Sequence, residues 1–158
     1  MDQKQVNFMR EAIRLACENV RSGLGGPFAA LVVKDGKIIA TGVNRVTRDL
    51  DPTAHAEVNA IRNACKVLGS FQLEGCEIYT TCEPCPMCLG AIYWARPQKV
   101  YYANTQTDAA GIGFDDSFIY KEIEIEARNR AIPMEPLLRE EGLEIFKLWE
   151  EAEGKTKY

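Results

Sequence analysis

The chain has 158 residues, of which 46% are hydrophobic and 27% charged, values typical of one ordinary globular domain spanning residues 1–158. Its net charge of −4 gives no general attraction for a polyanion, so we expect no nucleic-acid partner. No stretch is long and apolar enough to span a membrane, and the N-terminal residues lack the apolar core of a secretory signal, so we expect no membrane partner.

The first half of the chain predicts a helix, a β-hairpin and a second helix. Residues 5–22 carry apolar side chains at three- and four-residue spacing, which predicts an amphipathic helix. Residues 28–34 and 37–43 are strand-like and flank Asp35-Gly36, a typical tight hairpin turn. The next helix is predicted from about residue 54 to residue 68, with His55 in its first turn.

The next part of the chain predicts two strands joined through a helix. Residues 77–81 and 99–103 form short strand-like runs. Between them, prolines mark the start of a helix of about residues 86–94, which places Cys85 at its N-terminus. Residues 104–114 are mostly small or polar and predict a loop.

The last part of the chain predicts two more helices, of about residues 117–128 and 140–151. Strands that alternate with helices after an opening hairpin predict an α/β fold, with a mixed sheet sandwiched between layers of helices. His55 and Cys85 fall at the starts of two of these helices, which face one end of the sheet. Open α/β sheets commonly bind their ligands there.

Two short segments, His55-Ala56-Glu57 and Pro84-Cys85-Pro86-Met87-Cys88, form the pattern H-x-E…P-C-x-x-C. This pattern is the signature of zinc-dependent nucleobase deaminases. One imidazole and two thiolates suit tetrahedral zinc, and three protein ligands leave a fourth position for water. The segments therefore predict a catalytic zinc site with His55, Cys85 and Cys88 as ligands, and His55 is the only histidine in the chain.

Glu57 lies two residues from His55, close enough to share the cavity without being a ligand. A carboxylate there can accept a proton from water and return it to the substrate, which predicts Glu57 as the catalytic acid and base.

Other interpretations of the cysteines remain open. A lone C-x-x-C can be a redox pair, and Cys82 could complete a closed structural site with His55, Cys85 and Cys88. An iron–sulfur run would need a further cysteine, and none follows Cys88. The chain has six cysteines without a secretory signal, so a metal site in a reducing, cytoplasmic setting is favoured over disulfides.

Longer segments carry a resemblance to a known family. Over nearly its whole length the chain resembles the cytidine-deaminase-like superfamily, and within it the bacterial guanine deaminases. The segments that carry the resemblance are Gly25-Gly26-Pro27-Phe28, Asp51–Glu57, Thr81–Pro97, Gly113–Tyr120 and the terminal Tyr158.

The resemblance implies a three-layer α/β/α sandwich with a central mixed five-stranded sheet. It implies that His55, Cys85 and Cys88 hold one Zn²⁺ per chain and that Glu57 shuttles protons. The purine pocket that it implies comprises Phe28, Asn44, Ala56 through its backbone N–H, Trp94, Asp116 and Tyr158. On composition alone, Asn44 would be a turn residue.

The resemblance further implies a homodimer that exchanges residues of about 130–158, so that Tyr158 would close its own site or that of the partner. The expected reaction is hydrolysis of a small-molecule purine base, guanine, to xanthine and ammonia. Three alternatives stay open: a deaminase of another base, a nucleoside or an amino-triazine; a tRNA adenosine deaminase; and a non-catalytic, zinc-stabilised binding module.

Overall fold

The computed structural model describes residues 2–158 and divides the chain into two compact units. The first unit ends at Asp116 and the second begins at Ser117. Every strand belongs to the first unit. The candidate metal ligands and Glu57 belong to it as well.

A four-stranded mixed sheet forms the centre of the first unit. The strands are β1 (Ala29–Lys34), β2 (Lys37–Val43), β3 (Cys76–Cys82) and β4 (Lys99–Asn104). Their order is β2-β1-β3-β4, with antiparallel pairs except for the parallel pair β3 and β4. The mixed sheet is confirmed, but the expectation of five strands is wrong. Within residues 105–158 the chain forms helices and irregular segments, and no fifth strand.

The hairpin between β1 and β2 forms where the sequence predicts it. Asp35 and Gly36 have φ angles of 50° and 71°, the two positive values that a tight two-residue hairpin turn requires. The turn pairs Lys34 with Lys37 and Val33 with Ile38, and the register then shifts by one residue at an irregularity between Val32 and Val33.

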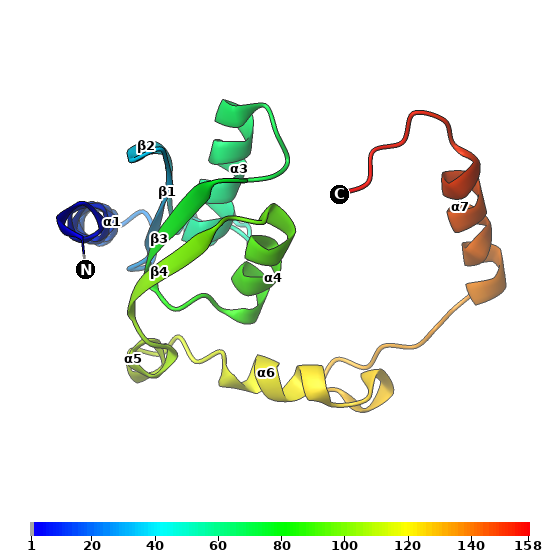
Figure 1. Cartoon of the computed structure of the whole chain (residues 1–158). Helices are drawn as coiled ribbons and strands as arrows, with labels where there is room; N and C mark the ends of the chain where they lie inside the picture. The colour runs from blue at the N-terminus through cyan, green and yellow to red at the C-terminus, as the bar shows by residue number, and fades with distance from the viewer. Residues whose placement is uncertain (1) are drawn as a thin grey trace. The chain divides into compact units, whose positions relative to one another are not determined.

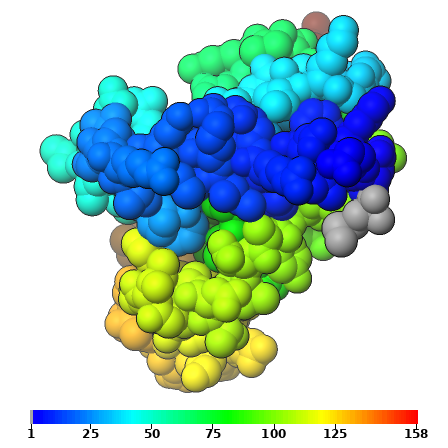
Figure 2. All heavy atoms as spheres, turned by 90° about the vertical axis from the view of Figure 1, so that its left-hand side faces the viewer, coloured from blue at the N-terminus to red at the C-terminus, as the bar shows by residue number. Residues whose placement is uncertain are grey.

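Helices cover both faces of the sheet (Figure 1). On one face lies α1 (Gln3–Arg21), which Figure 2 shows as a continuous ridge across this side. On the other face lie α3 (Ala56–Leu68) and α4 (Pro86–Ala95). Each interface has its own apolar core, so the first unit is a three-layer α/β/α sandwich.

Helix α3 packs unusually close to β2 at Gly42. A Cβ atom on Gly42 would lie 2.2 Å from the carbonyl oxygen of Ala56 and 2.4 Å from the backbone nitrogen of Ala60. Only glycine permits this approach, so Gly42 lets the first turn of α3 rest on the strand and helps to place His55.

Short helices occupy the connections around this core. They are α2 (Val46–Asp49) and α5 (Gln106–Gly111). The sequence predicts a loop at residues 104–114, but Thr105 and Asp108 form a reciprocal capping box that starts α5.

The second unit consists of α6 (Ser117–Glu124), a 3₁₀-helix (Ala127–Asn129) and α7 (Arg139–Glu151). The single helix expected over residues 117–128 is therefore two shorter pieces. No residue from 117 to 158 is buried, and Phe146 and Leu148 on α7 are mostly exposed. None of the helices within residues 2–158 has the length and apolar character needed to cross a membrane.

Candidate active site

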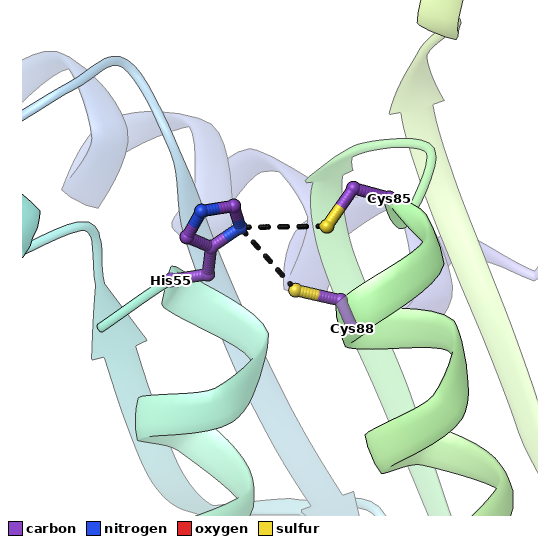
Figure 3. Close-up of side chains that lie close together, drawn as sticks. All are labelled: His55, Cys85 and Cys88. Carbon is purple, nitrogen blue, oxygen red and sulfur yellow. Dashed lines mark hydrogen bonds between the residues drawn. The ribbon is translucent and has the colours of Figure 1, made fainter. Parts of the chain in front are cut away.

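The candidate metal ligands lie at the starts of two neighbouring helices. His55 is the N-cap of α3 and Cys85 is the N-cap of α4, and both have extended backbone conformations. Neither side chain caps its own helix. Their side chains and that of Cys88, in the first turn of α4, instead point toward one another (Figure 3).

The spacing of these ligands fits a zinc ion. Nδ1 of His55 lies 3.5 Å from Sγ of Cys85 and 3.5 Å from Sγ of Cys88. A tetrahedral zinc with usual bond lengths would separate a nitrogen and a sulfur ligand by about 3.5 Å. The pKa of Cys85 is lowered, chiefly by the neighbouring Cys88 thiol and then by His55, which favours the thiolate that zinc requires.

Glu57 lies beside this cluster and is only 6% exposed. Its Oε1 accepts a hydrogen bond of 3.1 Å from Oγ1 of Thr80 on β3, and its Oε2 accepts one of 3.4 Å from Sγ of Cys88. Burial is the main cause that raises the pKa of Glu57. The site therefore holds a fixed carboxyl group that can carry a proton next to the candidate metal ligands.

Cys82 is buried but stands apart from the ligand cluster. The cluster of potential ligand atoms within 4.8 Å of one another comprises His55, Cys85 and Cys88. The thiol of Cys82 instead donates to the carbonyl oxygen of Thr105 at 3.7 Å, and burial chiefly raises its pKa to about 11. This arrangement supports an open three-ligand site over a closed site with Cys82 as fourth ligand.

A cavity of about 400 Å³ opens next to the cluster, within the size range of small-molecule sites. His55, Glu57 and Cys85 form part of its wall. The residues of the predicted purine pocket that line it are Phe28, Asn44, Ala56 and Asp116.

Asn44 is held so that its amide nitrogen faces no protein acceptor among the described residues. Its Oδ1 accepts hydrogen bonds of 3.3 Å from the backbone nitrogens of Gly26 and Val46. Its own backbone nitrogen donates to the carbonyl of Phe28 at 3.0 Å. The Nδ2 group therefore remains available to a ligand in the cavity.

Several cavity residues were not predicted from the sequence. Phe114 packs edge-on against Phe28, with ring centroids 5.0 Å apart, and both rings line the cavity. Glu83 lines it too and accepts a hydrogen bond from the backbone nitrogen of Gln106 at 3.1 Å. Glu83 lies between Cys82 and the metal motif that begins at Pro84, and this position is the sequence feature that could have identified it.

Trp94 and Tyr158, the other two residues of the predicted purine pocket, are not among the lining residues of the cavity in the first unit. Trp94 is 61% exposed and is not part of the cavity wall, because Cys88, Ile92 and Ala95 form the buried side of α4. Tyr158 is 70% exposed and lies in the second unit.

Comparison with known proteins identifies the class of protein that this fold and site define. Residues 2–104 match the model of the cytidine and deoxycytidylate deaminase zinc-binding region. The chain therefore belongs to this family of zinc-binding deaminases.

The relatives narrow the resemblance. The chain is 60% identical over 151 residues to guanine deaminase from Bacillus subtilis, covering 96% of this chain and 97% of the relative. A solved structure of guanine deaminase from Bacillus subtilis matches with a TM-score of 0.96 and 57% identity, covering 100% of this chain and 99% of that one. A tRNA-specific adenosine deaminase from Aquifex aeolicus is 41% identical over 105 residues, covering 66% of this chain and 69% of the relative. The resemblance to the bacterial guanine deaminases is thus confirmed.

Proposed function

We propose that this chain hydrolyses guanine to xanthine and ammonia. The observation that carries a deamination reaction is that the buried Glu57 carboxyl meets the ligand cluster of His55, Cys85 and Cys88 beside one cavity, whose wall includes Glu57, His55 and Cys85. Guanine as the substrate is supported by 60% identity to a guanine deaminase over almost the whole chain.

One zinc ion per chain fits the donor set of one nitrogen and two sulfurs. When bound, zinc supplies a water of lowered pKa and stabilises the negative charge that develops during the attack. The three ligands belong to the starts of two helices, whose positive dipole ends favour thiolates.

Glu57 moves the protons of the reaction. It accepts a proton from water as the oxygen bonds to C2 of guanine, the carbon that carries the exocyclic amine. It then delivers this proton to a ring nitrogen next to C2. Next it takes the second proton of the water from the hydroxyl now on C2 and passes it to the exocyclic amine, so that a carbonyl forms at C2, the bond from C2 to the amine breaks and ammonia leaves. Thr80 holds Oε1 of the carboxyl group in place throughout.

The remaining cavity residues orient the base. Nδ2 of Asn44 donates to an acceptor on the purine edge, and Asp116 accepts from a ring N–H. The rings of Phe28 and Phe114 provide apolar walls. The N–H of Ala56 belongs to the first turn of α3, whose amides have no intrahelical acceptor.

The charge of the cavity favours a free base. Its wall contains four carboxyl groups, those of Glu57, Glu83, Asp115 and Asp116, and the lining residues within the described chain include no lysine or arginine. Such a wall disfavours phosphate groups. If Asp116 meets an imidazole-ring N–H, a ribose on that nitrogen would remove the contact, so nucleosides are disfavoured as well.

The active form is a homodimer that exchanges its C-terminal segment, about residues 130–158. What supports this proposal is the second unit itself, in which no residue is buried although α7 carries Ile145, Phe146 and Leu148. Such side chains favour packing against a partner surface. Tyr158, and Trp94 on α4, would complete a purine pocket in the assembly.

Six free cysteines fit a cytoplasmic location.

A substrate panel tests the function. Zinc-loaded protein is assayed for ammonia release from guanine, guanosine, adenine, cytosine, an amino-triazine and a tRNA anticodon stem-loop. We expect guanine to be the best substrate, with xanthine as the product. Preferred turnover of another compound would replace guanine with that substrate. Bound zinc without turnover of any compound would favour the non-catalytic binding module.

A further inference from the structure

The amide of Asn19 is a buried polar group that the proposed reaction does not use. Asn19 lies near the end of α1 and is only 5% exposed. The other buried polar side chains within residues 2–158 are Asn44, Glu57, Thr80 and Thr81. Glu57 belongs to α3, Thr80 and Thr81 belong to β3, and Asn44 directly follows β2, whereas Asn19 belongs to α1, the helix on the opposite face of the sheet from α3.

Asn19 bridges two segments of the cavity wall. Its Nδ2 donates hydrogen bonds of 2.9 Å to the carbonyl oxygen of Gly26 and 2.9 Å to that of Asn44. Gly26 and Asn44 both line the cavity, but Asn19 does not. One side chain therefore satisfies two carbonyl groups and joins the segment before β1 to the segment after β2.

The packing around this bridge leaves little room for adjustment. A Cβ atom on Gly25 would lie 2.0 Å from the carbonyl oxygen of Asn44 and 2.9 Å from Nδ2 of Asn19. Gly26 also donates its N–H to Oδ1 of Asn44. A movement of Gly26 relative to Asn44 would thus change the direction of the Asn44 amide as well as the position of its backbone.

We propose that Asn19 is a positioning residue that fixes the amide of Asn44 for recognition of the base. Asn19 acts through its hydrogen bonds to Gly26 and Asn44. This inference rests on the proposed role of Asn44 in purine binding. Removal of the Asn19 amide should therefore raise KM when the Asn44 side chain is present and have little effect when it is absent. Proton transfer by Glu57 should be retained in both cases.

The kinetic test compares wild type, Asn19→Leu, Asn44→Ala and the double variant. Asn19→Leu keeps a side chain of similar size but removes both donors. We expect it to lower kcat/KM for guanine about 10- to 100-fold, mainly through KM, because a misplacement of about 1 Å can cost on the order of 10²-fold. In the Asn44→Ala background the same change should cost less than about 3-fold, because the amide that Asn19 orients is gone.

Asn63→Ala is the matched control. Asn63 on α3 also donates an amide N–H to a backbone carbonyl, that of Thr41 at 2.9 Å, but neither residue lines the cavity. Loss of the Asn63 amide should leave kcat and KM for guanine within about 2-fold of wild type. Zinc content should stay near one per chain in all variants.

A second measurement does not depend on activity. Hydrogen exchange followed by mass spectrometry should show faster exchange in residues 24–28 and 43–46 of Asn19→Leu, with residues 56–68 unchanged. Unchanged exchange in both segments, or an equal kinetic loss with and without the Asn44 side chain, would overturn the proposal. If wild type fails to deaminate guanine, the proposed function fails, but the exchange result still decides whether Asn19 holds the segments around Gly26 and Asn44 together.

Discussion

Sγ of Cys88 lies 3.4 Å from Oε2 of Glu57, so a candidate zinc ligand on α4 touches the candidate proton carrier on α3. The second carboxyl oxygen of Glu57 is held from β3 by Thr80. Metal binding and proton transfer therefore share one packed unit. Experiments on either residue need a readout for each process, zinc content for the first and turnover for the second.

Glu57→Gln separates these two processes. Glutamine keeps the shape of the side chain and can still contact Thr80, but it cannot carry the proton. We expect kcat for guanine to fall by at least about 10²-fold, a usual contribution of general acid–base catalysis. Zinc content and guanine binding, measured by metal analysis and calorimetry, should be retained. Turnover close to that of wild type would remove Glu57 from the mechanism.

The cysteines distinguish an open zinc site from a closed one. Cys88→Ala removes a ligand, so zinc and deaminase activity should be lost together. Cys82→Ser is the control, because the Cys82 thiol bonds to Thr105 and stands outside the ligand cluster. This control should keep zinc and most activity, as measured by metal analysis and ammonia release. Loss of zinc in Cys82→Ser would instead support a four-ligand structural site.

The sequence predicts most of the site because its signals are local. Prolines and apolar spacing mark the starts of α3 and α4, and the side chains that must meet lie within one turn of those starts. His55 is the N-cap rather than a residue of the first turn, a shift of one position that leaves the chemistry unchanged. The sequence motif alone was therefore enough to predict that the metal ligands and Glu57 lie close together.

The contacts that orient these residues could not be predicted in the same way. Thr80 meets Glu57 across 23 residues and Asn19 meets Asn44 across 25, and both contacts depend on how separate layers pack. The fifth strand was expected from the resemblance alone, since the strand-like runs of the sequence number four. The missed helix α5 had a local signal, the Thr105 and Asp108 pair of its capping box.

Gly42→Ala tests the close packing that places His55. The added methyl group would collide with the backbone of Ala56 and Ala60, which cannot move without shifting α3. We expect a loss of stability of about 1–3 kcal/mol, the usual cost of overpacking, with weaker zinc retention. Gly90→Ala is the control, because Gly90 lies inside α4 with no atom within 4 Å of the added Cβ. Denaturant unfolding should show Gly90→Ala to be neutral or stabilised by up to about 1 kcal/mol. Equal stability of Gly42→Ala and wild type would contradict this account.

Asp116→Asn tests how the base is recognised. Asp116 lines the cavity, and its pKa is raised chiefly by burial and then by the charge of Cys85. A carboxylate only accepts hydrogen bonds, whereas an amide can also donate them. An amide therefore selects a ring N–H over a ring nitrogen without hydrogen less strongly than a carboxylate does. We expect kcat/KM for guanine to fall, and the preference for guanine over guanosine to narrow, while zinc is retained. Asn can still cap the helix that starts at Ser117, so a large drop in Tm without a kinetic defect would mean that Asp116 serves the fold.

The last prediction concerns Tyr158 as a cover for the bound base. Terminal residues are usually mobile unless they are tied to another surface, and a terminal tyrosine offers an apolar ring together with a polar hydroxyl and carboxylate. A cover over the cavity would exclude bulk water and hold guanine for attack. Deleting residues 155–158 should leave the fold, the zinc content and the proposed dimer intact but lower kcat/KM for guanine at least about 10-fold, as steady-state assays would measure. Lys157→Ala, which keeps the tyrosine, should behave as wild type.

Mixing two defective chains then determines which chain supplies the cover. The truncated chain keeps Glu57 but lacks Tyr158, whereas a full-length Glu57→Gln chain keeps Tyr158 but lacks the proton carrier. If the C-terminal segments exchange, a heterodimer combines the intact site of one chain with the intact tail of the other, and activity should rise above that of either parent. Unchanged kinetics after truncation would refute the covering role. A damaging truncation without rescue, under conditions in which subunits exchange, would mean that each tail covers the site of its own chain.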